Sequence, residues 1–180
     1  MIMILMGTGF EEAEALIPCD FLRRAGLDVK LISLYDKLTV SGGHGIKVEC
    51  DLSINSVSEL PEAIILPGGL GGVEEISACP KALELIKRCH SENKTVAAIC
   101  AAPTVLGKLG ILNDKKATCY PDMRSQLICS RWVDSDVVVD KNVLTSKAAG
   151  TASEFAFALI THLLGKEASE KVLSSVYFPR

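Results

Sequence analysis

Cys100 is the residue in this chain with the most evident chemistry. It follows the short run V-A-A-I and precedes A-A-P-T. The run predicts a buried strand, and Pro103 suits the first turn of a helix, where a missing N–H costs nothing. A side chain between the two sits on a tight corner, near the free N–H groups and positive dipole end of the helix. Those surroundings predict a thiol driven toward thiolate, the form that attacks carbonyl carbons and reacts with peroxide. The alternative is a buried structural cysteine.

Three glutamates, Glu11, Glu12 and Glu14, follow the first predicted strand in the run G-F-E-E-A-E. Acidic side chains in the first turn of a helix stabilise its dipole, which accounts for at least two of them. One carboxyl facing Cys100 would share a proton with the thiol, because two neighbouring anions do not both ionise cheaply. Such an acid can donate a hydrogen bond to sulfur or move protons for a substrate. Helical periodicity does not choose among the three glutamates.

A second strand end carries the glycine-rich run L-P-G-G-L-G-G at residues 66–72. Glycines let the backbone approach a ligand closely and aim N–H groups at a developing negative oxygen. A plain turn is the alternative. A phosphate cradle is disfavoured because neither G-x-G-x-x-G nor G-K-[ST] is present.

The three histidines do not suggest a Cys–His–Asp triad. His90 and His162 fall on predicted amphipathic helices, and His44 falls at the tip of a glycine-rich hairpin, where a histidine is usually solvated. The chain also lacks the G-x-S-x-G run of serine hydrolases. A protease triad is therefore not expected.

Strands and helices alternate along the chain. Apolar runs and turn residues predict strands at 2–6, 29–34, 63–66 and 95–99, hairpins at 38–48 and 137–145, and helices at 10–25, 80–92, 103–109, 153–164 and 167–175. Repeated β-then-α units with continuous apolar strands indicate a mostly parallel sheet covered on both faces. Such folds place ligands at the carboxyl ends of strands, where Cys100 and the two glycine-containing turns fall.

Composition narrows the class of protein. The 180 residues predict a single domain over 1–180, and 48% hydrophobic with 23% charged residues is typical of a globular chain. A net charge of −3 without a basic run argues against a nucleic-acid partner. Seven scattered cysteines without a C-x-x-C pair fit neither a disulfide framework nor a zinc site. We therefore expect a reduced, cytoplasmic protein without a metal, a membrane span or a signal peptide.

Four runs together carry a family resemblance. They are L-M-G-T-G-F-E-E-A-E-A-L-I-P-C-D-F-L-R-R-A-G, I-I-L-P-G-G, A-A-I-C-A-A-P and A-A-G-T-A-S-E-F-A. In this order they resemble the ThiJ/PfpI superfamily, and within it the DJ-one branch of Parkinson-disease-associated deglycases. The resemblance implies a flavodoxin-like α/β three-layer sandwich related to class I glutamine amidotransferases, usually a homodimer. It places the reactive cysteine on Cys100, its acid on Glu14, and backbone N–H donors on Gly68, Gly69 and Ala101.

The chain also departs from the family pattern. Where the branch often has a histidine in a T-H-P context, this chain has A-T-C-Y-P, with Tyr120 at that position. This departure weakens the expectation of strong glyoxalase activity. The protease-like branch has a histidine directly after the cysteine, and Ala101 stands there, which disfavours a protease or amidase. In the branch's dimers the hairpin carrying His44 approaches the partner's site, so we expect His44 to reach the other subunit's Cys100 pocket.

Two functions from different classes follow from the resemblance. The first is a cofactor-free, cysteine-dependent glyoxalase or deglycase that acts on methylglyoxal or glycated adducts and protects against carbonyl and oxidative stress. The second is a redox-responsive sensor or chaperone in which Cys100 is oxidised to sulfenic and sulfinic acid. Cys119 is the candidate partner for a disulfide with Cys100. A relative with an inactive site is the third alternative, because fold does not fix function.

Overall fold

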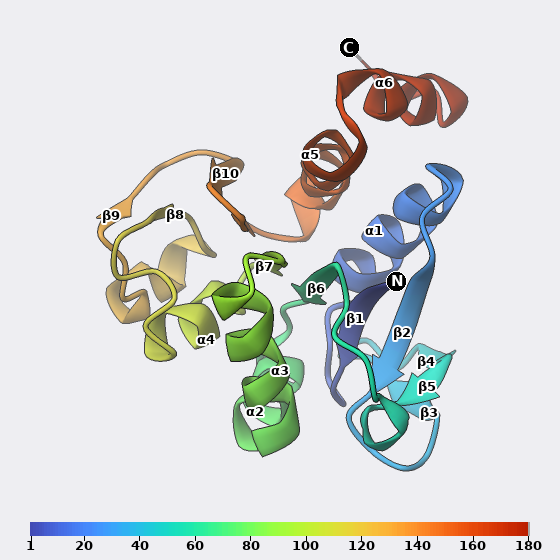
Figure 1. Ribbon diagram of the computed structural model, residues 1–180, viewed down its shortest axis with the longest axis vertical. Coiled ribbons are helices and arrows are strands. Elements are labelled where there is room, and N and C mark those ends of the chain that lie inside the picture. The colour runs from blue at the N-terminus through green and yellow to red at the C-terminus, as the bar shows by residue number, and fades with distance from the viewer. Residues whose placement is uncertain (180) are drawn as a thin grey trace.

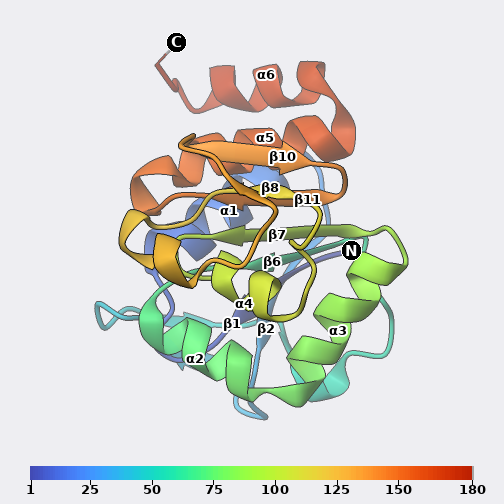
Figure 2. The ribbon, with the colours of Figure 1, turned by 90° about the vertical axis from the view of Figure 1, so that its left-hand side faces the viewer.

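The computed structural model describes residues 1–179 and contains a central seven-stranded sheet between two layers of helices (Figure 1 and Figure 2). The strand order is β10-β11-β7-β6-β1-β2-β5. The strands are β1 (Ile2–Met6), β2 (Val29–Ser33), β5 (Leu52–Ser53), β6 (Ala63–Leu66), β7 (Thr95–Ile99), β10 (Val137–Asp140) and β11 (Val143–Ser146). All neighbours are parallel except the edge pair β10 and β11. The predicted α/β fold with a mostly parallel sheet is confirmed.

The helices divide between the two faces of the sheet. They are α1 (Glu12–Arg24), α2 (Leu70–Ala78), α3 (Pro80–Ser91), α4 (Pro103–Lys108), α5 (Ala152–Leu164) and α6 (Lys166–Ser175), with 3-10 segments η1 (Ile54–Ser56), η2 (Pro121–Gln126) and η3 (Ala149–Thr151). Helices α1, α5 and α6 lie on one face, and α2, α3 and α4 lie on the other (Figure 1). The strands read as unbroken apolar runs because both faces are covered.

Alternation along β1 shows how one strand supplies both layers of the core. Ile2, Ile4 and Met6 pack with residues of α1 and α5. Met3 and Leu5 point to the opposite face and pack with residues of α2 and α3. Successive side chains of a strand point to opposite faces, so five consecutive apolar residues fill two cores.

The sequence does not predict helix α2, because the run L-P-G-G-L-G-G indicates a turn. The structure begins the helix at Leu70, with Gly69 as its N-cap. A Cβ at Gly72 would lie 2.8 Å from the Phe10 Cα, so this glycine allows close packing against the chain after β1. Tertiary contact thus outweighs the low helix propensity of glycine at this place.

Two small sheets lie outside the main one. The hairpin predicted at residues 38–48 is confirmed as the antiparallel pair β3 (Thr39–Ser41) and β4 (Lys47–Glu49). The parallel pair β8 (Lys116–Ala117) and β9 (Arg131–Trp132) was not predicted, because two-residue strands leave no periodic pattern. Across residues 1–179, no helix combines the length and apolar character needed to cross a membrane.

Candidate active site

Cys100 occupies a strained corner directly after β7. Its φ is +65°, in the left-handed region that costs a non-glycine residue about 1–2 kcal/mol. The corner is held on both sides: the Cys100 N–H donates to the Ser146 carbonyl at 2.9 Å, and the Tyr120 N–H donates to the Cys100 carbonyl at 2.8 Å. The tight corner predicted from the sequence is therefore present. Helix α4 starts only at Pro103, three residues further along.

Glu14 is the glutamate that faces this cysteine. Its side chain projects from the first turn of α1 and is 1% exposed. The carboxyl accepts a hydrogen bond from the Gly68 N–H at 2.8 Å, and the Cys100 thiol and the Ala149 N–H lie near enough to lower its pKa. Residues after β1, β6, β7 and β11 thus meet at one carboxyl group. The structure resolves the choice that helical periodicity left open.

Both partners of this pair hold their protons more tightly than usual. Burial raises the pKa of Glu14 to about 7. Burial, and then the charge of Glu14, raises the pKa of Cys100 to about 12, although N–H groups of Ala101 and Gly69 bond the sulfur and lower it. The prediction that the corner drives the thiol toward thiolate is therefore wrong, because loss of solvation raises the pKa more than the backbone donors lower it. Between these two values the pair holds one proton, and a thiolate exists when Glu14 carries it.

Gly68 and Gly69, which follow β6, place their N–H groups differently. The Gly68 N–H is taken up by Glu14, so Gly68 orients the acid and does not offer its N–H to a ligand. A Cβ at Gly68 would lie 2.6 Å from the Cys100 Cβ and would overlap Glu14 Oε2. Gly69 has φ +79°, and its N–H joins that of Ala101 at the sulfur. Two backbone N–H groups therefore lie near the reacting atom and lower its pKa.

The sulfur opens onto a cavity of about 480 Å³. Cys100 is partly exposed there, whereas Cys19, Cys50, Cys89 and Cys119 are buried. The cavity is lined by Glu11, Glu14, Gly69, Leu70, Cys100, Ala101, Tyr120, Asp122, Met123, Ala148 and Ala149. Such a cavity has the size of a small-molecule site. Its position at the carboxyl ends of the central strands agrees with the general rule for open α/β sheets.

Several lining residues were not singled out from the sequence. Leu70 is 65% exposed at the start of α2, and Asp122 and Met123 lie on the unpredicted segment η2. Nothing local in C-Y-P-D-M indicates a binding position, because these residues reach the cavity only through the path of the loop. Tyr120, which stands where the family pattern has histidine, lines the cavity and is 40% exposed.

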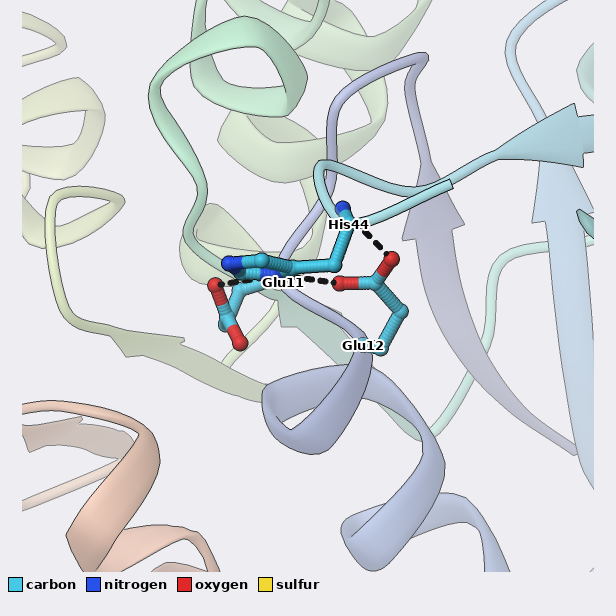
Figure 3. A group of neighbouring side chains, drawn as sticks. All are labelled: Glu11, Glu12 and His44. Carbon is cyan, nitrogen blue, oxygen red and sulfur yellow. Dashed lines mark hydrogen bonds and ion pairs between the residues drawn. The ribbon is translucent and has the colours of Figure 1, made fainter. Parts of the chain in front are cut away.

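His44 lies against the start of α1 in its own chain (Figure 3). The Nδ1 of its ring lies 2.9 Å from Glu12 Oε2 and 3.7 Å from Glu11 Oε2. The backbone N–H of His44 donates to Glu12 Oε1 at 2.8 Å. The bond to Glu12 raises the pKa of His44. Burial works to raise the pKa of Glu12, but the bonds from His44 and the Ile46 N–H bring it below its ordinary value. These three side chains have ligand-type atoms within 4.8 Å of one another, already engaged in pairing among themselves.

The remaining candidate residues from the sequence do not line the cavity above Cys100. Cys119 is buried, and its thiol donates to the Tyr120 carbonyl at 3.3 Å. All seven cysteines are free thiols, so the considered disulfide between Cys100 and Cys119 is not formed in this structure. His90 and His162 lie on α3 and α5 and do not line the cavity.

Comparison with known proteins identifies the family. The model of the DJ-1/PfpI family matches residues 1–162. The chain belongs to this family. It is 38% identical over 173 residues to the protein dj-1beta of Drosophila melanogaster, covering 94% of this chain and 92% of that protein. It is 34% identical over 149 residues to a Pyrococcus horikoshii protein named as a deglycase, covering 81% and 89%.

Solved structures agree with this assignment to the DJ-1/PfpI family. The structure titled as oxidized DJ-1 of Toxoplasma gondii superposes with a TM-score of 0.96 at 31% identity, covering 99% of this chain and 98% of that one. A DJ-1 homologue of Arabidopsis thaliana is 37% identical over 174 residues. The chain spans only 40% and 45% of the length of the two plant relatives it matches.

Proposed function

We propose that this DJ-1/PfpI protein is a cysteine-dependent glyoxalase or deglycase that converts methylglyoxal or glycated adducts without a cofactor. The observation that carries the proposal is the Cys100 sulfur, which opens onto the cavity beside buried Glu14 and two backbone N–H groups. Relatives of similar length in Pyrococcus are named as deglycases. The seven free thiols suit a reducing compartment such as the cytoplasm.

The first step of the proposed reaction uses the shared proton. With the proton on Glu14, the Cys100 thiolate adds to the aldehyde carbon of methylglyoxal, and the carbonyl oxygen becomes the hydroxyl of a hemithioacetal. The N–H groups of Ala101 and Gly69 lie at the sulfur and stabilise negative charge that develops on the adjoining oxygen. Glu14 supplies the proton that this oxygen takes up.

The second step moves hydrogen between two carbons. Glu14, now ionised, removes the proton from the former aldehyde carbon and returns it to the neighbouring carbon, which turns the hemithioacetal into a lactate thioester. Water then attacks the thioester, lactate leaves, and the thiol is restored. The sum is methylglyoxal plus water giving lactate, so neither an oxidant nor a reductant is consumed. A pKa of about 7 suits Glu14 to both proton donation and proton removal near neutral pH.

Substitution of the nucleophile tests this function. Cys100→Ser is expected to lower the rate of lactate formation from methylglyoxal by at least about 100-fold, because a serine hydroxyl is a far weaker nucleophile near neutral pH. Cys79→Ser, which changes a partly exposed cysteine between α2 and α3, is the matched control and keeps its rate. Equal lactate formation by wild type and Cys100→Ser, measured enzymatically on purified protein, would refute the proposal.

A further inference from the structure

Residues 121–127 form part of the wall of the cavity above Cys100. Asp122 and Met123, which lie on η2, line the cavity, and no η2 side chain is buried. Among the residues that the structure describes, the only hydrogen bond from 121–127 to the rest of the chain runs from the Met123 N–H to the Tyr120 carbonyl at 2.9 Å. A segment that is exposed and has so few bonds to its surroundings opens at a low cost in free energy.

The two ends of this segment are held in place. At the first end, the Tyr120 N–H donates to the Cys100 carbonyl at 2.8 Å. At the second end, the backbone of Ile128 packs closely against Gly107 of α4, where a Cβ would lie 2.7 Å from the Ile128 carbonyl oxygen. Residues 121–127 therefore span two fixed points, about which they can turn as a unit.

Between these ends, a single charged side chain ties the segment to the body of the protein. The guanidinium of Arg124 stacks over the ring of Trp132 on β9, at 4.1 Å from the ring centroid. Met123 and Leu127 add partly buried apolar packing against the core layer that includes α4 residues. The Nε1 of Trp132 is buried without a hydrogen-bond partner, which costs free energy that water would return if the ring were uncovered. The contacts that hold the segment down are thus few and partly opposed.

From these contacts we propose that residues 121–127 are a lid on the Cys100 cavity, kept closed by the stack of Arg124 on Trp132. A cation–π contact at a partly exposed site is weak, so the open position stays populated. Reagents and substrates that are too large for the closed entrance reach the sulfur through the open position. The lid controls access to Cys100 whatever reaction the thiol performs, and the inference therefore goes beyond the proposed function.

Two uncharged maleimides of different size measure the opening. N-methylmaleimide and N-(1-pyrenyl)maleimide both add the Cys100 sulfur to their double bond, and nothing leaves. Peptide mapping follows the rate at Cys100, because Cys79 and Cys129 are also partly exposed, and each rate is normalised to that with 2-mercaptoethanol at the same pH. Arg124→Gln is expected to raise the pyrenyl rate about fivefold, the effect on an opening equilibrium of losing about 1 kcal/mol of stacking. The N-methyl rate is expected to change by less than about twofold, because the small reagent passes the closed entrance.

Matched variants separate the stack from the charge of the side chain. Arg131→Gln removes the same charge from an exposed residue next to Trp132 and is expected to leave both rates unchanged. Arg124→Lys keeps the charge without the planar group, so its pyrenyl rate is expected to lie between those of wild type and Arg124→Gln. Circular dichroism checks that each variant is folded.

The fluorescence of Trp132, the single tryptophan, gives a second measure of opening. Quenching by acrylamide is expected to increase in Arg124→Gln and not in Arg131→Gln, because only the first change uncovers the ring. A pyrenyl rate in Arg124→Gln no higher than in Arg131→Gln overturns the lid. An equal rise of both maleimide rates also overturns it, since that would mean a changed thiol and not a wider entrance. Unchanged quenching shows that Arg124 does not keep the segment closed. Neither readout requires turnover, so the result stands whether or not lactate is formed.

Discussion

At the scale of single residues, the site is a pair of groups that share one proton. Cys100 and Glu14 lie beside one another in a corner with little solvation, and each has a raised pKa. Neither the helix dipole nor the backbone donors make the thiolate alone. A thiolate requires that the neighbouring carboxyl hold the proton that the sulfur gives up. The reactivity of Cys100 is therefore expected to depend on Glu14 as much as on the cysteine itself.

The Glu14 pKa predicts a pH-dependent contribution to stability. Its native pKa of about 7 lies above the ordinary 4.5, so the native state binds this proton more tightly than the unfolded chain. The contribution is fully present below pH 4.5 and is lost as pH rises through about 7; it amounts to at most about 3 kcal/mol. The amide side chain that Glu14→Gln introduces does not titrate. The wild-type free energy of unfolding, minus that of the variant, is therefore expected to fall between pH 4.5 and 8.

Urea unfolding followed by the fluorescence of the single tryptophan, Trp132, measures this difference. Glu74→Gln, an exposed position on α2, serves as the control for removing one carboxyl from the surface. Parallel wild-type and Glu14→Gln curves over the whole range would show that the carboxyl does not bind its proton more tightly in the native state.

At the scale of elements, four strand ends build the site. Strand β6 leads to Gly68 and Gly69, β7 leads to Cys100, and β11 leads to Ala148 and Ala149. Helix α1, which follows β1, brings Glu14 into the middle of these turns, where the Gly68 N–H holds it. The site is precise because each part is fixed by a strand or by a helix start. The turn after β6 tolerates little added volume.

Gly68→Ala tests how tightly this turn is packed. The added methyl would press on the Cys100 Cβ and the Glu14 carboxyl, so we expect a loss of about 1–3 kcal/mol in the free energy of unfolding. The displaced carboxyl is also expected to slow lactate formation. Gly150→Ala is the matched control, because a Cβ there would meet no atom within 4 Å. Similar unfolding curves for the two variants would mean that the turn has room to relax.

At the scale of the whole molecule, the predictions concern a second subunit. The homodimer and the approach of His44 to a partner's cavity stay predictions from the family resemblance. In the single chain the His44 side chain is 70% exposed, so its ring is accessible to a neighbouring chain while it bonds Glu12. Glu11, which lines the cavity above Cys100, has its Oε2 3.7 Å from the Nδ1 of this ring.

Mixed dimers test this arrangement. Sedimentation is expected to give about twice the chain mass of 19.3 kDa. His44→Ala is expected to reduce lactate formation, whereas His162→Ala, an exposed position on α5, is not. If His44 serves the partner's cavity, mixing inactive Cys100→Ser chains with His44→Ala chains is expected to restore activity at the His44→Ala subunit's cavity. No gain on mixing, or full activity of His44→Ala alone, would contradict the prediction.

The sequence by itself determined the strands and helices other than α2, β5, β8 and β9, the mostly parallel sheet and the corner at Cys100. It could do so because the spacing of apolar residues, the glycines that end helices and Pro103 at a helix start are local signals of backbone conformation. The family resemblance placed the acid on Glu14, a choice that periodicity alone did not make. Tertiary structure decided the rest: the raised thiol pKa, the use of the Gly68 N–H by Glu14, helix α2, and the convergence of Glu11 and Asp122. These depend on burial and on contacts between distant segments, which no local pattern encodes.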